Sequence, residues 1–240
     1  MAKYALLNNI QHKDLRVITQ FSATYGDNIT STLTFPTEFA DVQKEYPIFF
    51  QINPDTAKYQ SVVLFGISQN ENLFLKSDGT WDANFIPAVI ARGPFLIGFQ
   101  QDPNNPGSKE PVIHVDMESP KISTAEGTPI FLEFGGNTAF LDNITRSLKD
   151  IYDGMAISER MFQAFIELDL IEPVNIEIEL NNGEKHRLNG NHTINRDKLA
   201  NLTGDQLLQL NSSGFLAAAF SVVASLGNMQ KLIDIKNSKK

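Results

Sequence analysis

The chain has 240 residues, of which 42% are hydrophobic and 20% charged, so it can bury a sizeable core and is neither disordered nor collagen-like in composition. Its formal net charge of −8 disfavours generic binding to nucleic acid or to an anionic membrane surface. It contains no cysteine, which excludes disulfide scaffolds, thiolate zinc sites, iron–sulfur clusters and cysteine nucleophiles.

The first residues, MAKYALLNNIQHKDLRV, lack a continuous apolar segment and a small-residue cleavage site. They therefore predict no secretory signal, and we expect a cytoplasmic protein. The most apolar stretch, residues 214–226, is shorter than the roughly 20 residues that a membrane-spanning helix needs. We expect it to be a buried helix, without membrane insertion.

Short apolar runs alternate with polar breaks near the beginning of the chain, which predicts strands at residues 4–9, 15–21, 29–35 and 46–52, with a short helix at 38–45. Two apolar runs joined by a polar loop, residues 61–67 and 72–75, predict a hairpin. Further along, the sequence predicts a helix and a strand within 85–99, a loop at 100–110, and strands at 111–117 and 129–134.

Beyond residue 136 the spacing of apolar residues changes to that of helices. Residues 137–170 predict two amphipathic helices separated near Asp153 and Gly154. Residues 173–188 alternate strictly around Asn182-Gly183, which is typical of a β-hairpin. Three more helices are expected: one around Lys198, one that begins at Thr203, and a long one from Gly214 to about Ile235.

These elements predict an α+β fold of one compact unit. A mostly β portion, residues 1–136, is expected to pack against a helical portion, residues 137–240, which carries the hairpin near residues 173–188. No flexible linker is predicted between the two portions.

One candidate binding site combines Trp81, Asp82 and Arg92. The single tryptophan follows a tight turn, and Arg92 is the single charged residue of the apolar stretch 85–99. An arginine in such a stretch needs a partner or solvent, so this set suits a carboxylate-bearing, sugar or peptide ligand. The alternative is that Trp81 packs in the core and Arg92 pairs with a carboxylate such as Asp82.

A metal site is a second candidate. His114 and Asp116 share one face of a predicted strand, and His186 or His192 could complete a two-histidine, one-carboxylate set that suits non-haem iron. The alternative is an edge-strand histidine followed by an aspartate that starts a turn. Since such a triplet is short and common, we predict no cofactor and keep the iron site as an alternative.

Catalytic motifs of serine hydrolases, zinc proteases and nucleotide-binding proteins are absent from the sequence. A carboxylate-based hydrolase could still use Asp116, Glu118, Glu126 and Glu133, because paired acids have no fixed spacing in sequence. The alternative is that these residues belong to solvated acidic loops.

Several segments of the chain resemble the bacterial SapC family: residues 38–50, 62–75, 78–97, 126–131 and 214–233. The third is the most specific, because its turn, tryptophan, Ile-Pro, arginine and Pro-Phe follow in the family's order. His114 is not part of the family pattern.

The resemblance implies no assigned reaction. The family is named for surface-layer proteins, and its genes often lie near TonB-dependent receptors, cupin-like proteins and flavin-dependent halogenase-like proteins, which implies an accessory role in nutrient or peptide handling.

We therefore expect a non-catalytic, cytoplasmic accessory or binding protein with a protein, peptide or small-molecule ligand near Trp81 and Arg92. An iron-dependent or carboxylate-based enzyme and a surface-layer component are the alternatives. Whether the chain forms a homodimer is left open.

Overall fold

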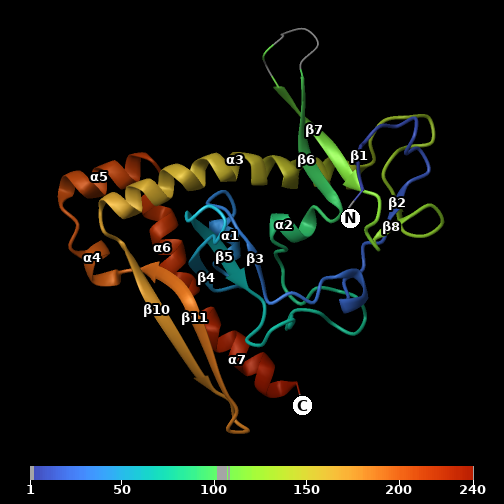
Figure 1. The fold of residues 1–240 in the computed structure, drawn as a ribbon. Coiled ribbons are helices and arrows are strands. Elements are labelled where there is room, and N and C mark those ends of the chain that lie inside the picture. Colours follow the sequence, from blue (N-terminus) through green and yellow to red (C-terminus); the bar gives the residue numbers. More distant parts are fainter. Residues whose placement is uncertain (1–2, 102–106, 108, 240) are drawn as a thin grey trace.

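The apolar runs of the sequence form three antiparallel sheets in a computed structural model, which describes residues 3–101, 107 and 109–239 (Figure 1). The largest sheet has the strand order β10-β11-β4-β5-β3. Its strands are β3 (Ser31–Leu33), β4 (Ile48–Ile52), β5 (Tyr59–Leu64), β10 (Ile171–Glu179) and β11 (Lys185–Ile194). Because β11 pairs with β4 through His192 and Phe50, strands from both ends of the chain share this sheet.

Two three-stranded sheets, with the orders β1-β7-β6 and β8-β2-β9, complete the β structure of the described residues. Their strands are β1 (Tyr4–Leu6), β2 (Arg16–Val17), β6 (Phe95–Gln101), β7 (Lys109–Asp116), β8 (Ile122–Ser123) and β9 (Thr128–Pro129). Of the loop predicted at 100–110, residues 102–106 and 108 lie outside the described residues. Strands β6 and β7 flank it on both sides, and they pair from Phe95 with Val115 to Gln101 with Lys109.

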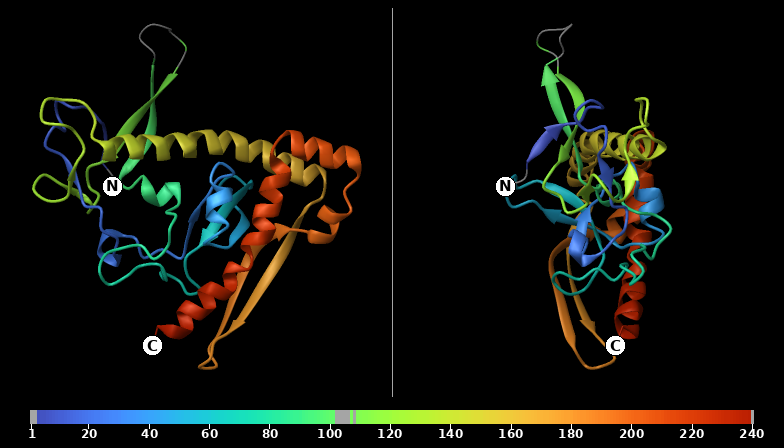
Figure 2. Two further views of the ribbon diagram at one scale, coloured as in Figure 1. Left: turned by 180° about the vertical axis from the view of Figure 1, so that it is seen from behind. Right: turned by 90° about the vertical axis from the view of Figure 1, so that its right-hand side faces the viewer.

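One long helix, α3 (Ala139–Glu167), runs from α5 (Gly204–Ser212) to the β6–β7 hairpin, above the five-stranded sheet in the view of Figure 1. The other helices are η1 (Ala23–Tyr25), α1 (Phe39–Val42), α2 (Ala88–Ala91), α4 (Arg196–Ala200), α6 (Phe215–Ser225) and α7 (Asn228–Ser238). The β10–β11 hairpin and α7 run side by side (Figure 2), and the backbone N–H of Asn181 donates to the side-chain oxygen of Asn237 at 2.9 Å.

Helix α3 packs on two separate hydrophobic cores. Its first half buries Leu141, Ile144 and Leu148 against residues of the small sheets, among them Val17, Phe95 and Val115. Its second half buries Met161, Phe162 and Phe165 in the core of the five-stranded sheet, where α6 contacts β4 and β11. Fully burying one large apolar side chain stabilises a fold by about 1.5–3 kcal/mol, so these contacts fix α3 at both ends.

The α+β fold is confirmed, with the sheets mainly in the N-terminal part and a helical C-terminal region. Strands β10 and β11 confirm the hairpin around Asn182-Gly183. The helix expected from Thr203 is also confirmed, because the Thr203 hydroxyl accepts from the Gln206 N–H while the Gln206 side chain accepts from the Thr203 N–H.

Several predictions about elements are wrong. Residues 61–67 and 72–75 do not form a hairpin: β5 pairs with β4 on one side and β3 on the other, so both of its edges are occupied. The strand expected at 129–134 is reduced to β9 and a single bridge between Phe131 and Asn137. Residues 137–170 form one helix rather than two, because α3 continues through Gly154.

The long C-terminal helix is interrupted by a turn between α6 and α7. The side-chain amide of Asn228 donates to the carbonyl oxygens of Gln43 and Tyr46 at 2.8 and 3.1 Å, which ties the start of α7 to the end of α1.

By length and composition, the stretch Phe215–Ser238 could cross a membrane, which is a weak indication because core helices share this property. Here the Ser225 hydroxyl accepts from the Ile48 N–H at 2.9 Å, so α6 packs on the protein's own sheet.

Candidate functional site

Trp81 lies in the main hydrophobic core, with 8% of its surface exposed. Its ring is stacked over Phe74 with the centroids 6.1 Å apart. The indole Nε1 donates to the hydroxyl of Tyr46 at 2.7 Å, and that hydroxyl donates to the carbonyl oxygen of Phe85 at 2.5 Å. The single polar group of the indole is therefore used inside the protein.

Asp82 and Arg92 do not pair, and neither is joined to Trp81 in one pocket. Asp82 is exposed and faces Lys76 across the tight turn, with 3.6 Å between the ammonium nitrogen and a carboxylate oxygen. Arg92 ends α2 and donates from Nη1 to the carbonyl oxygen of Phe95 at 2.5 Å. Of the three residues, only Arg92 lines the groove described next.

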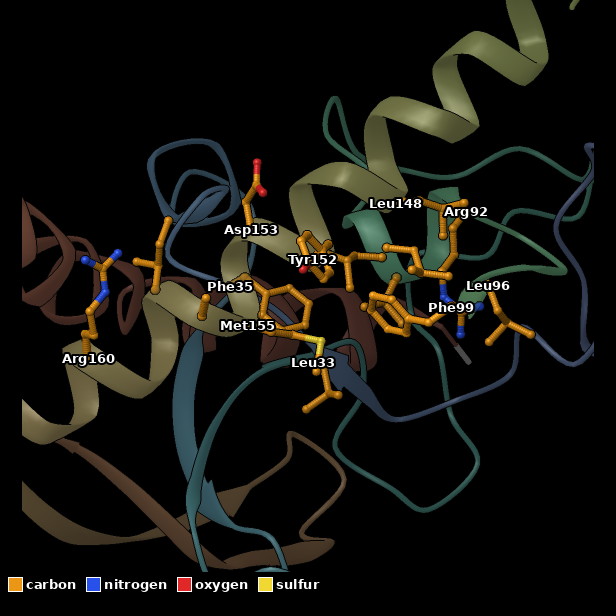
Figure 3. Close-up of a pocket in the computed structure, with 15 residues that line it drawn as sticks. Leu33, Phe35, Arg92, Leu96, Phe99, Leu148, Tyr152, Asp153, Met155 and Arg160 are labelled. Atoms are coloured by element: carbon orange, nitrogen blue, oxygen red, sulfur yellow. The ribbon is translucent and has the colours of Figure 1, made fainter. Parts of the chain in front are cut away.

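A groove of about 820 Å³ lies between α2, β6 and the middle of α3, and we call it the α3 groove. Apolar side chains form most of its lining, among them Leu33, Phe35, Leu96, Phe99, Leu148, Tyr152 and Met155 (Figure 3). Met155 is 60% exposed and Phe99 52%, so the groove displays large apolar side chains to solvent. Such a volume is within the usual range for a ligand site.

Two arginines stand at opposite ends of this lining, Arg92 beside β6 and Arg160 on α3 (Figure 3). Neither guanidinium pairs with a carboxylate of the described residues. Burial lowers the pKa of Arg92 from its usual value, a change that Tyr4 opposes, and an arginine remains charged under these conditions. Asp153, the acidic residue of the lining, is paired with Lys149 one helical turn earlier. The groove thus offers unpaired positive charge on an acidic protein.

A second groove, of about 740 Å³, lies between β5 and the second half of α3, and we call it the β5 groove. Leu33, Phe35 and Met155 line both grooves and form the ridge between them. Lys58 and Glu159 lie at this groove and pair with each other at 2.7 Å.

The proposed metal ligands are not brought together. His114 and Asp116 lie on β7 in a small sheet, whereas His192 lies on β11 in the large sheet, where its ring packs edge-on against Tyr59. The Nε2 of His186 lies 3.0 Å from a carboxylate oxygen of Glu184. Among the residues that the structure describes, no three His, Cys, Asp or Glu side chains form a group that could hold a metal ion.

The four carboxylates of the hydrolase alternative lie at the end of β7 and in the connections that follow it. Asp116 is half-buried, while Glu118, Glu126 and Glu133 are exposed. Glu126 lies between β8 and β9, and Glu133 lies beyond β9. None of the four lines the α3 groove.

Sequence reasoning singled out Arg92 but missed the surface that Arg92 faces. The spacing of apolar residues in 137–170 predicted helix, but it gave no sign that Tyr152 and Met155 stay exposed and line this groove. Their position beside Gly154 was the available sign, since a glycine within an amphipathic helix often marks a close approach of another segment.

A family model described as SapC matches residues 7–232, which include every element that lines the two grooves. No curated protein and no solved structure matches the chain significantly.

Proposed function

This chain belongs to the SapC family, and we propose that it is a non-catalytic, cytoplasmic accessory protein whose α3 groove binds an apolar, acidic segment of a partner protein. One observation carries the proposal: Arg92 is partly buried in an apolar groove, and its guanidinium has no carboxylate partner among the described residues.

The charge of Arg92 defines what the partner must supply. Removing a charged group from water costs free energy that a well-placed opposite charge offsets. Arg92 uses one N–H on the carbonyl oxygen of Phe95, which leaves further donors of its planar fork for a carboxylate. An aspartate, a glutamate or a chain terminus of the partner fits this requirement.

The length of the groove supports a helical segment as its occupant. The residues of α3 that line it run from Leu148 to Arg160, which corresponds to roughly 18 Å of helix at 1.5 Å per residue. About twelve residues of a partner helix cover that distance. An amphipathic helix would place its apolar side chains against Tyr152 and Met155, the usual manner of helix-in-groove recognition, with acidic residues near the two arginines.

The chemistry of the lining favours binding over catalysis. Its titratable side chains are Arg92, Tyr152, Asp153 and Arg160. Asp153 is already paired with Lys149, and the lining provides no nucleophile held beside a general base. A peptide-binding groove agrees with the accessory role in peptide or nutrient handling that the family resemblance implies.

The proposal is tested by selecting random twelve-residue peptides on the immobilised protein, in parallel with an Arg92→Met, Arg160→Met double variant. Methionine keeps an apolar stem at both positions while it removes the charge. We expect wild type to enrich peptides with apolar residues at helical spacing and at least one acidic residue, and the double variant to lose the acidic preference.

The matched control is Lys44→Met, which removes an exposed cation that pairs with Asp41 and does not line the groove. It should select the same peptides as wild type. For an enriched peptide, Arg92→Met should weaken binding about tenfold, as expected for one charge-assisted hydrogen bond. The proposal is wrong if acidic residues are not enriched, or if the double variant selects the same sequences.

A further inference from the structure

Two buried serine hydroxyls in the β5 groove have no hydrogen-bond partner among the described residues. Ser61 on β5 is 2% exposed, and its Oγ is unpaired. The Oγ of Ser158 on α3 is also buried and unpaired. Buried hydroxyls in folded proteins are nearly always hydrogen-bonded, because an unpaired one costs free energy. Two of them in one groove call for an explanation.

The sheet contributes a third unpaired atom on the same face. His192 on β11 pairs with Phe50 on β4, and Phe50 pairs with Ser61 on β5, so the three residues form one row across the sheet. Residues that are opposite each other in neighbouring strands point to the same face. Phe50 packs against Phe162 of α3 with the ring centroids 5.0 Å apart, so the row faces α3. The Nδ1 of His192 is buried without a partner as well.

From this arrangement we infer that the β5 groove is a separate small-molecule site that binds an uncharged, mostly apolar compound through a hydroxyl or carbonyl group. Ser61 and Ser158 come from opposite walls of the groove, and each hydroxyl can both donate and accept. Because both oxygens are buried, the polar group of a ligand must enter between β5 and α3 to satisfy them. The inference is independent of the peptide-binding role proposed for the α3 groove.

The remaining lining supports a neutral ligand. Tyr59, Phe162 and Ile166 provide apolar walls. The charged residues Lys58 and Glu159 neutralise each other, and their exposed ion pair leaves no uncompensated charge between them. The α3 groove differs in this respect, because its two arginines lack carboxylate partners among the described residues. An anionic ligand is therefore expected to prefer the α3 groove.

The test is an NMR titration of the full chain, carrying ¹³C-labelled methyl groups, with three probes of similar length: 1-octanol, 1-fluorooctane and octanoate. Ile166 lines only the β5 groove and Ile151 only the α3 groove, so their methyl signals report the two sites separately. We expect 1-octanol to shift the Ile166 signal with an affinity about tenfold above that of 1-fluorooctane, a difference of one hydrogen bond.

Substitution of the serines decides whether the hydroxyls cause that preference. In Ser61→Ala, Ser158→Ala the affinity for 1-octanol should fall to that for 1-fluorooctane, whereas 1-fluorooctane should bind as it does to wild type. The variant is expected to fold, since removing an unpaired buried hydroxyl leaves no donor without a partner. Ser221→Ala is the matched control, because it removes a hydroxyl that donates to the carbonyl oxygen of Ala217 within α6 and does not line the groove.

Four results would overturn the inference, three of which concern the relative affinities. These three are equal affinities of wild type for 1-octanol and 1-fluorooctane, a preference for 1-octanol that survives in the double variant, and a stronger response of Ile166 to octanoate than to 1-octanol. Absence of any saturable shift of Ile166 with 1-octanol contradicts it equally.

Discussion

Gly154 and Phe35 touch where α3 crosses the segment that follows β3: a Cβ atom on Gly154 would lie 2.5 Å from the Cβ of Phe35. The same atom would lie 2.9 Å from the Thr37 hydroxyl, which donates to the carbonyl oxygen of Asp150 at 3.1 Å. Because Phe35 forms part of the ridge between the two grooves, this contact sets the position of both.

Gly154→Ala is therefore expected to destabilise the protein. In an unhindered helix the change would stabilise by about 1 kcal/mol, because alanine is the better helix former. Here the added methyl group must displace Phe35 and Thr37, and overpacking of this kind costs about 1–3 kcal/mol. Urea unfolding followed by circular dichroism should show a net loss of up to about 2 kcal/mol.

Gly204→Ala provides the matched control, since nothing lies within 4 Å of a Cβ at this first residue of α5. It should leave stability unchanged or raise it by up to about 1 kcal/mol. A Gly154→Ala variant that gains stability as Gly204→Ala does would show that α3 and Phe35 are not in the contact described.

Local patterns predicted the elements whose determinants lie within a few residues. Asn182-Gly183 specifies the turn between β10 and β11, and Thr203 with Gln206 closes the start of α5. Gly154 was misread because the glycine is required by Phe35, which is distant in sequence. The apolar residues 72–75 were misread for a similar reason, since Phe74 packs against Trp81 rather than pairing as a strand.

The candidate site was predictable only in part. That Arg92 stands out in an apolar stretch is visible in the sequence, and the structure places it at a groove. Which surface it faces depends on how α2 and α3 pack, and no local pattern encodes that. Trp81 follows the core-packing alternative, because its indole N–H has a buried partner in Tyr46.

The hydrogen bond between Trp81 and Tyr46 should contribute to stability and not to binding in the α3 groove. Trp81→Phe removes the donor and leaves space in the core, for which we expect a loss of about 2–3 kcal/mol. Tyr46→Phe leaves the indole N–H and the carbonyl oxygen of Phe85 without this partner, at a cost of about 1–3 kcal/mol.

A double-mutant cycle isolates the bond itself. The two substitutions should be non-additive by about 1 kcal/mol, as expected for residues in direct contact. Unfolding is followed by circular dichroism, because Trp81→Phe removes the single tryptophan. Strict additivity would contradict the bond, and a change in peptide affinity without loss of stability would instead place Trp81 at a binding site.

Glu38 should make the protein less stable as the pH rises. Its carboxyl group is buried and accepts from the Thr34 hydroxyl at 2.7 Å and from the Ala88 N–H at 2.8 Å. Burial raises the pKa of Glu38 above the ordinary value of 4.5, and these hydrogen bonds only partly oppose the effect. The folded state therefore holds the proton more tightly than the unfolded state, so the stabilisation is complete below pH 4.5 and is lost as the pH rises through the folded pKa.

Glu38→Gln removes this titration while it keeps the shape of the side chain and an acceptor for Ala88. Relative to the glutamine variant, wild type should lose stability between pH 4.5 and neutral pH. Denaturant unfolding of both proteins across this range measures the difference. A difference that is constant with pH, or that grows in favour of wild type, would refute the predicted direction.

Glu71 is expected to show the opposite dependence. Burial raises its pKa, but the ammonium group of Lys236 and the backbone N–H groups of Ile67 and Ser68 outweigh burial and hold the pKa below 4.5. The contribution of this carboxylate is therefore present above pH 4.5 and lost as the pH falls through the folded pKa. Glu71→Gln should destabilise the protein at neutral pH, and the difference in its free energy of unfolding from wild type should shrink as the solution is acidified.

The control is Asp41→Asn, which disrupts the exposed pair with Lys44 and should cost less than about 1 kcal/mol at neutral pH. Denaturant unfolding of both variants measures these effects. Equal effects of the two substitutions would show that Glu71 does not anchor α7 to the loop after β5.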